Sequence, residues 1–114
     1  MLINAFLEKL NHTPDTIAFN ETMAVIEENY TFSAVAFSNG EQKNAPGENS
    51  GSCKLFAFAQ LQELNKEQTL ACFGDYYRID VLQNPNATDH QNIRQFMLQG
   101  WSGISFDAPA LTAK

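Results

Sequence analysis

Apolar residues at the start of the chain recur at the spacing of an amphipathic helix. Residues three, four and seven positions apart share one face of a helix. That spacing predicts a first helix of about eleven residues that ends at Asn11 and His12. The apolar positions of this face are Leu2, Ile3, Phe6, Leu7 and Leu10.

A second helical pattern begins after Thr13-Pro14-Asp15. This tripeptide is typical of a helix start, because proline suits the first helical position and an acidic side chain suits the positive end of the helix. Asn20 is a further capping residue, so the pattern fits either one helix or two short ones. The inward positions are Phe19, Met23, Ile26 and Tyr30.

The middle of the chain carries its most apolar run. The consecutive apolar residues from Leu55 to Ala59 leave no polar face, and a helix that is hydrophobic all round lies at the centre of a fold. We expect this helix to begin at Ser50 or Ser52 and to end in a turn at Leu64-Asn65. Asn65 and Gln68 have the spacing of a capping box, which predicts that another helix begins there.

That helix is expected to reach Gln83, just before the turn signal Asn84-Pro85-Asn86. Its inward positions are Leu70, Phe73, Tyr77 and Val81. A last helix is then predicted between a cap at Thr88 and a stop at Gly100, with Asp89 in its first turn. The inward positions of the last helix are Ile93, Phe96 and Met97.

Two short segments have the character of strands. Thr31–Phe37 and Trp101–Phe106 are rich in β-branched and aromatic residues, so we expect them to pair. Asn39–Gly51 has no large apolar side chain and is expected to form a long loop, while Asp107–Lys114 is expected to be loosely held. The predicted fold is therefore mainly α (α+β at most): a compact single domain spanning residues 1–114, with about five helices and one short two-stranded element.

Charge and composition exclude several classes of function. The 114 residues carry a net charge of −6, and the few Lys and Arg residues are scattered, which argues against a nucleic acid or an anionic membrane as partner. The start MLINAFLEKL has no positive first region and carries charges at Glu8 and Lys9, so we expect it to be neither a Sec signal peptide nor a membrane span. No His-x-x-x-His, Cys-x-x-Cys or glycine-rich phosphate loop occurs, so the sequence predicts neither a metal site nor a cofactor.

The cysteines Cys53 and Cys72 are expected to be reduced. In a helical hairpin that turns at Leu64-Asn65, the two residues lie on different helices at heights that differ by roughly 6 Å. Adding the separation of two packed helices places them beyond disulfide reach.

One arrangement suggests nucleophilic catalysis. Cys53 follows Gly51-Ser52 at a helix start, where the helix dipole lowers the pKa of a thiol, and His90 and Asn92 follow in the order found in papain-like cysteine proteases. A catalytic pair needs the base within hydrogen-bond reach of the sulfur. We expect helices between the two residues, so Cys53 and His90 are retained only as an alternative catalytic pair beside a structural role for Cys53.

A polar and aromatic edge is the predicted binding site. Its residues combine large side chains with polar groups, as residues that carry interface energy do. A structural reading stands beside it, in which Asp75 and Arg78 form a local ion pair and Trp101 covers the core. The members of the predicted edge are Asp75, Tyr76, Arg78, His90, Arg94 and Trp101.

Three long segments resemble the HopJ type III effector family. These are GSCKLFAFAQL, TLACFGDYYR and DHQNIRQFMLQGWSGISFD, and the resemblance extends from about Phe19 to Leu111. The family takes its name from plant-pathogen proteins delivered into host cells by type III secretion, and the resemblance implies no catalytic motif.

The resemblance, taken with the residues, favours an uncharacterised effector-like protein that acts as a non-enzymatic interaction module. The alternatives are a small cysteine-dependent hydrolase or transferase using Cys53 and His90, and a small-ligand binding domain. The expected partner is a host or bacterial protein or a small ligand. Because Met1–Leu10 is apolar, whereas effector N-termini are usually polar and Ser-rich, we expect the protein in the bacterial cytoplasm, with delivery into a host cell as the alternative that the resemblance implies.

Overall fold

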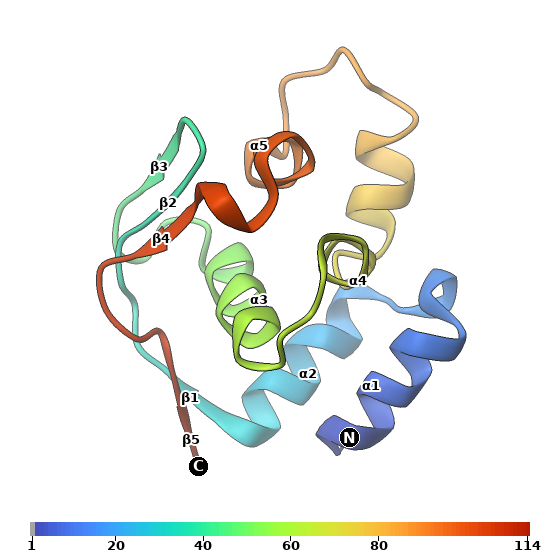
Figure 1. Cartoon of the computed structure of the whole chain (residues 1–114), viewed down its shortest axis with the longest axis vertical. Coiled ribbons are helices and arrows are strands. Elements are labelled where there is room, and N and C mark those ends of the chain that lie inside the picture. The colour runs from blue at the N-terminus through green and yellow to red at the C-terminus, as the bar shows by residue number, and fades with distance from the viewer. Residues whose placement is uncertain (1) are drawn as a thin grey trace.

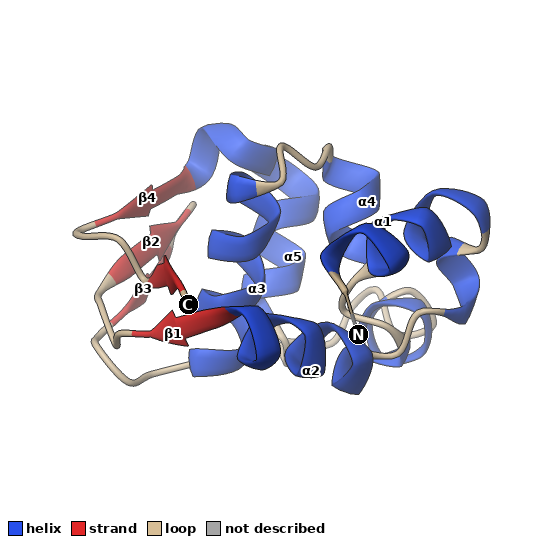
Figure 2. Cartoon of the chain, turned by 90° about the horizontal axis from the view of Figure 1, so that it is seen from below, coloured by secondary structure: helices blue, strands red, loops and turns tan. Residues whose placement is uncertain are grey.

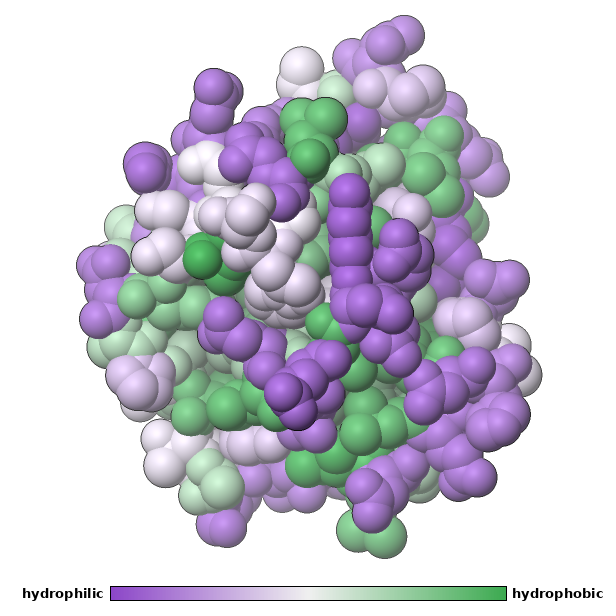
Figure 3. Space-filling model, in the orientation of Figure 1, coloured by the Kyte–Doolittle hydropathy of each residue, from purple (hydrophilic) through white to green (hydrophobic). Residues whose placement is uncertain are grey.

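Helix α3 (Ser50–Leu61) lies at the centre of the fold (Figure 1). The computed structural model describes residues 2–114. The strands gather at one end of the molecule and the helices occupy the remainder (Figure 2). A radius of gyration of 13.2 Å is that of a compact domain of this length. On the face seen in Figure 1, hydrophilic and hydrophobic residues are interspersed (Figure 3). The fold is therefore a helix-rich α+β domain, as the sequence predicts in outline.

Within residues 2–114, five α-helices are joined by shorter helical turns. The other α-helices are α1 (Ile3–His12), α2 (Phe19–Asn29), α4 (Lys66–Ala71) and α5 (Gln91–Gln99). The short elements are the 3-10 helices η1 (Pro14–Thr16) and η3 (Gly100–Gly103) and the π-helix η2 (Tyr76–Val81). The strands are β1 (Tyr30–Phe32), β2 (Phe37–Asn39), β3 (Gln42–Asn44), β4 (Ile104–Phe106) and β5 (Leu111–Ala113).

The strands form two small antiparallel sheets, in place of the one two-stranded element expected. In the larger sheet β2 lies between β3 and β4, and Phe37 pairs with both Asn44 and Phe106. In the smaller sheet β1 pairs with β5. Of the expected pairing between Thr31–Phe37 and Trp101–Phe106, only the pair of Phe37 and Phe106 is confirmed. The start of the first segment lies in β1, which pairs with β5 in the other sheet.

The apolar run of α3 forms the middle of the core, as predicted. Leu55, Phe56, Phe58 and Ala59 are fully buried. The ring of Phe56 contacts four other aromatic rings, so it joins the sheet, the chain after α4, and α5. These rings are Phe37, Phe73, Phe96 and Trp101, with centroids 5.0–6.3 Å away.

Several predicted helix ends are confirmed. The first helix spans Ile3–His12. The Asn65 side chain accepts a hydrogen bond from Gln68 N at 2.8 Å, and Asn65 N donates to Gln68 Oε1 at 3.0 Å, which is the predicted capping box. Gly100 ends α5 with a φ of 60°. All three signals are local, so they do not depend on the tertiary fold.

Other predicted helix starts are wrong. The caps of α3 and α5 are Asn49 and His90, in place of Ser50 or Ser52 and Thr88. The second pattern divides into η1 and α2, and the N-cap of α2 is Ala18 in place of Asn20, with the Ala18 backbone N–H donating to Glu21 Oε1 at 3.1 Å. Tyr30 belongs to β1 and not to the inward face of a helix.

The helix expected from Asn65 to Gln83 is broken at Gly74. Gly74 has a φ of 63°, and a Cβ atom there would lie 2.7 Å from the backbone nitrogen of Phe19. The chain must therefore turn where it passes the start of α2, and only glycine fits that approach. Helix α4 ends at Ala71, and η2 begins at Tyr76.

Two segments expected to be irregular contain strands. The loop Asn39–Gly51 begins with the β2–β3 hairpin, in which Gly40 turns with a φ of 58°. The expected loose tail contains β5, and its Ala110 and Leu111 are buried. The β3 segment is entirely polar and β5 has only three residues, so neither shows the alternating pattern of a strand.

Candidate functional site

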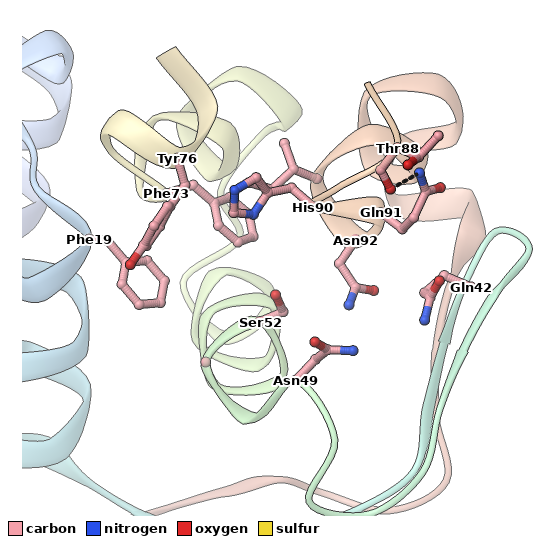
Figure 4. Close-up of a pocket in the computed structure, with 12 residues that line it drawn as sticks. Phe19, Gln42, Asn49, Ser52, Phe73, Tyr76, Thr88, His90, Gln91 and Asn92 are labelled. Carbon is pink, nitrogen blue, oxygen red and sulfur yellow. Dashed lines mark hydrogen bonds between the residues drawn. The ribbon is translucent and has the colours of Figure 1, made fainter. Parts of the chain in front are cut away.

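A cavity of about 450 Å³ lies between the first turns of α3 and α5. Figure 4 shows the polar side chains that converge on it from β3, α3 and the segment before α5. The side chains that matter for its polar chemistry are Gln42, Asn49, Ser52, Thr88, His90 and Asn92. No Lys, Arg, Asp or Glu is among the described residues that line it.

One wall of the cavity is aromatic. Phe19, Phe73 and Tyr76 line it, with the Phe19 ring stacked on Phe73 at 6.3 Å and edge-on to Tyr76 at 5.2 Å. Tyr76 also faces the His90 imidazole, with the ring centroids 5.3 Å apart. Because Phe73 is buried while Tyr76 is 45% exposed, the wall extends from the core to the surface.

Asn49 and Asn92 line the cavity and belong to a network of side-chain amides behind it, which forms its polar floor. Asn39 Nδ2 donates to the Asn92 backbone oxygen at 2.6 Å. Asn44 Nδ2 and Asn92 Nδ2 each donate to the other residue's Oδ1, at 3.2 and 3.1 Å. Asn49 Nδ2 donates to Asn44 Oδ1 at 2.7 Å. Asn39, Asn44 and Asn92 are all buried, so the network fixes the β2–β3 hairpin against α5.

Some polar groups at the cavity surface have hydrogen-bonding capacity to spare. Asn92 Nδ2 uses one of its two hydrogens on Asn44, and the second has no acceptor within residues 2–114. The Ser52 hydroxyl likewise has no hydrogen-bond partner in that range, and Figure 4 shows it directed toward the cavity. These groups are free to bind a ligand.

The two helices begin in the same unusual way. Asn49 and His90 have φ values of 50° and 51°, and neither side chain caps its own helix. The first N–H groups of a helix have no intrahelical acceptor, so the first turns of α3 and α5 present polar backbone to the cavity.

His90 is held at the cavity rim by carboxylates outside the cavity. Its Nε2 lies 3.1 Å from Asp80 Oδ2 and 3.9 Å from Asp89 Oδ2. Arg94 Nη2 donates to Asp89 Oδ1 at 2.8 Å, and this hydrogen bond lowers the pKa of the Asp89 carboxyl. His90 is thus oriented by Asp80 and Tyr76.

The predicted binding residues do not form one surface. Tyr76 and His90 line the cavity, whereas Asp75, Tyr76 and Arg78 line a neighbouring hollow of about 500 Å³. Arg94 lines neither of them. The structure therefore brings Tyr76 together with His90 on one side, and with Asp75 and Arg78 on the other.

Trp101 has a different position from the other five. Its Nε1 donates to the Leu64 backbone oxygen at 2.9 Å. Its ring meets Phe56 and Phe96 edge to face, and it lines neither hollow. Trp101 thus covers the core in the way that the structural reading of the sequence describes.

Arg78 fastens the chain after α4 to the segment before α2. Arg78 Nη2 donates to the Ile17 backbone oxygen at 2.6 Å and lies 3.6 Å from Asp75 Oδ1, which confirms the predicted ion pair. The guanidinium also reaches Pro14 and Ala71 backbone oxygens. These contacts occupy most of its donors.

Cys53 lies outside the cavity although Gly51 and Ser52 line it. Cys53 is 2% exposed, and burial raises the pKa of its thiol above the ordinary value. A raised pKa disfavours the thiolate that a nucleophile requires. The geometry therefore gives no support to the pair of Cys53 and His90.

Cys72 is also buried and unpaired, and burial raises its pKa to about 12. Within residues 2–114, no group of three or more His, Cys, Asp or Glu side chains is placed to hold a metal ion. In the same range, no helix is both long and apolar enough to cross a membrane.

A comparison with known protein families shows to which family the chain belongs. The model of the HopJ type III effector protein family matches residues 3–111. The chain belongs to the HopJ type III effector family. The predicted resemblance is thereby confirmed over nearly the whole chain.

The HopJ chain is also similar to a protein of known structure. It has 56% sequence identity and a TM-score of 0.99 with the crystal structure described as that of the "unknown function protein VPA0580", covering 100% of this chain and 95% of that one. No curated protein matches the chain. The comparisons therefore give a family and a fold.

Most of the cavity was not predicted from the sequence. Of its polar and aromatic groups, only Tyr76 and His90 were among the predicted binding residues. The missed signal is the repeated asparagine in the segment expected to be a loop, at Asn39, Asn44 and Asn49. Asparagine is common in loops, so these residues were indistinguishable from ordinary turn residues.

Proposed function

We propose that this HopJ protein is a non-enzymatic binding module that takes a small polar ligand in the cavity between α3 and α5. One observation carries the proposal. Asn92 is only 6% exposed, yet it lines a cavity of about 450 Å³ and keeps one amide hydrogen unused there. A volume of this size lies within the range of small-ligand sites.

The energetic cost of the amide network supports the proposal. Burying a polar side chain costs free energy unless its hydrogen bonds are made. This small domain buries Asn39, Asn44 and Asn92 together, and Asn39 Oδ1 has no partner within residues 2–114. Apolar residues would join the hairpin to α5 without that cost. A rigid polar floor that presents Asn92 to a ligand accounts for the network.

The arrangement favours binding over catalysis. The cavity has an imidazole at its rim, but Asp80 and Tyr76 hold that imidazole. The thiol considered as its partner is buried and has a raised pKa. A hydroxyl or thiol nucleophile is activated by a base within hydrogen-bond reach, and among the described residues the side-chain hydrogen bond of His90 goes to the Asp80 carboxylate and to no hydroxyl or thiol.

A thermal-shift screen with a blocked variant tests the proposal. A library of small polar metabolites is screened against the wild-type protein and against Ser52→Leu, which places a larger side chain in the cavity. A ligand at a hundred times its Kd stabilises the folded state by about 2.7 kcal/mol, so Tm should rise by several degrees. The rise should be absent in Ser52→Leu.

Ser105→Leu is the matched control, because Ser105 is exposed on β4, outside the cavity lining. It should respond to the same ligand as the wild-type protein does. The proposal fails if no compound raises the Tm of the wild-type protein, or if Ser52→Leu responds equally.

The location of the protein is a separate expectation. We keep the bacterial cytoplasm as the expected site of action, with delivery into a host cell as the outcome that the family name implies. A fusion to a calmodulin-dependent adenylate cyclase distinguishes the two locations, because this enzyme makes cyclic AMP only inside the host cell. A signal that depends on a working type III apparatus would establish delivery.

A further inference from the structure

The cavity between α3 and α5 and the second hollow share two lining residues. Phe19 and Tyr76 line both spaces, which have volumes of about 450 and 500 Å³. The Tyr76 ring, 45% exposed, therefore stands between two polar hollows. Such a ring is a platform on which a ligand larger than either hollow can rest.

The lining of the first hollow favours an uncharged ligand. It contains amides and hydroxyls that both donate and accept hydrogen bonds, and no Lys or Arg. A phosphate would lack a cationic partner there and would approach Asp80 and Asp89, whose carboxylates lie 3.1 and 3.9 Å from His90 Nε2. Like charges this close to the rim oppose an anionic ligand.

The spare polar groups match the hydroxyls of a sugar. A side-chain amide carries an acceptor oxygen beside a donor nitrogen, so it can bind two neighbouring hydroxyls at once. Asn92 offers a donor hydrogen, Ser52 offers a hydroxyl that donates or accepts, and Asn49 Oδ1 accepts no hydrogen bond within residues 2–114. The hydroxyl groups of a sugar can bind all three of these groups, because a hydroxyl both donates and accepts hydrogen bonds.

The aromatic wall suits the other side of a sugar ring. Pyranose rings have a face of C–H groups, and such a face packs against an aromatic ring through apolar contact and weak C–H hydrogen bonds. Tyr76 is the most exposed ring of this wall, since Phe73 is buried and Phe19 is half-buried.

The second hollow offers acceptors for a further sugar unit. Asp15 and Asn20 line it, and neither side chain forms a hydrogen bond or ion pair with another described residue. Free carboxylate and amide oxygens accept hydrogen bonds from hydroxyl groups. The spare capacity thus lies on both sides of Tyr76.

We propose that the two hollows together bind a short neutral saccharide, with one sugar unit in the cavity between α3 and α5 and the next over Tyr76 toward Asp15. This inference rests on the proposed binding function and adds the class of ligand. Its specificity comes from Asn92, Asn49 and Ser52 in the first hollow and from the Tyr76 ring between the hollows.

An NMR titration of the ¹⁵N-labelled protein tests the inference. The saccharide probes are glucose, N-acetylglucosamine, maltose, cellobiose and diacetylchitobiose. The probes of other classes are inorganic phosphate, AMP and spermidine. At least one disaccharide should shift the amide signals of Ser52, Asn92 and Tyr76 saturably, and more tightly than its monosaccharide does.

Substitutions then locate the saccharide. Ser52→Ala should weaken binding about three- to tenfold, the effect of one hydrogen bond, and Tyr76→Ala should weaken it about tenfold. Tyr76→Phe keeps the ring and should bind nearly as the wild-type protein does. Asn4→Ala, an exposed change on α1, serves as the control.

The remaining outcomes overturn the inference in distinguishable ways. If phosphate or AMP shifts the same amides and no saccharide does, the ligand class is wrong and the binding function stands. If only spermidine binds, near Asp15 and Asp75, the second hollow is a cation site. If no probe shifts any of these signals, the saccharide is excluded, and the metabolite screen decides separately whether the cavity binds anything.

Discussion

Asn39 Nδ2 lies 2.6 Å from the backbone oxygen of Asn92, which joins β2 to the first turn of α5 across 53 positions of the chain. Both residues are buried, and Asn92 lines the cavity. The shape of the binding site therefore depends on a contact between two segments that are remote in sequence.

Asn39→Ala should destabilise the protein by about 1–3 kcal/mol, because it removes a buried donor and leaves the Asn92 oxygens with fewer partners. Unfolding in urea measures the change. Asn4→Ala, on the exposed face of α1, should stay within about 0.5 kcal/mol of the wild-type protein. Equal stability of the two variants would show that the amide network contributes nothing to the fold.

Alanine substitutions at Gly74 and Gly47 distinguish the cost of a steric clash from the cost of backbone strain. Both glycines have a positive φ, 63° at Gly74 and 88° at Gly47. A Cβ atom added at Gly74 would lie 2.7 Å from Phe19 N, whereas one added at Gly47 would have no atom within 4 Å. Gly47→Ala should cost about 1 kcal/mol from backbone strain alone. Gly74→Ala should cost clearly more, because the backbone of α2 must also move.

Unfolding in guanidinium chloride compares the two glycine variants under identical conditions. A similar loss in both would mean that the start of α2 adapts freely, and the close approach at Gly74 would not explain why α4 ends there.

The buried thiol of Cys72 should make stability fall at high pH. Its pKa is raised from 9.0 to about 12 by burial, so the unfolded state loses this proton first as the pH rises. Between pH 9 and 12 the unfolded state therefore binds fewer protons at this position, and the free energy of unfolding declines by up to about 1.4 kcal/mol per pH unit. Below pH 9 the contribution is constant.

Cys72→Ala removes that dependence while leaving the other titrating groups in place. Urea unfolding from pH 7 to the highest pH at which the protein folds reversibly should give a shallower decline for the variant. Parallel curves for variant and wild type would contradict a raised pKa at Cys72.

The sequence predicts those parts of the fold that local chemistry decides. The capping box of Asn65 and Gln68, the stop at Gly100 and the apolar run of α3 each depend on neighbours within a few positions. The break at Gly74 does not, because the residue that requires it is Phe19, on another helix. The apolar positions Leu70, Phe73 and Val81 keep a helical spacing across the turn, so the sequence pattern alone predicts one continuous helix.

The candidate site was harder to predict than the fold. Its floor joins residues from the hairpin and from α5, and their amides resemble the polar residues of any loop. Tyr76 and His90 were identified because large side chains with polar groups are distinctive in any context. Trp101 shares that character, but its indole N–H is used by Leu64. Residue type alone therefore does not distinguish a residue that lines the cavity from one that covers the core.

A crystal structure of the protein bound to the ligand that emerges from the metabolite screen shows directly whether the cavity between α3 and α5 is the binding site. The account predicts that the ligand occupies the cavity between α3 and α5, with polar atoms about 3 Å from Ser52 Oγ and Asn92 Nδ2 and an apolar face against Tyr76. A ligand bound elsewhere, with Ser52 and Asn92 untouched, would contradict it.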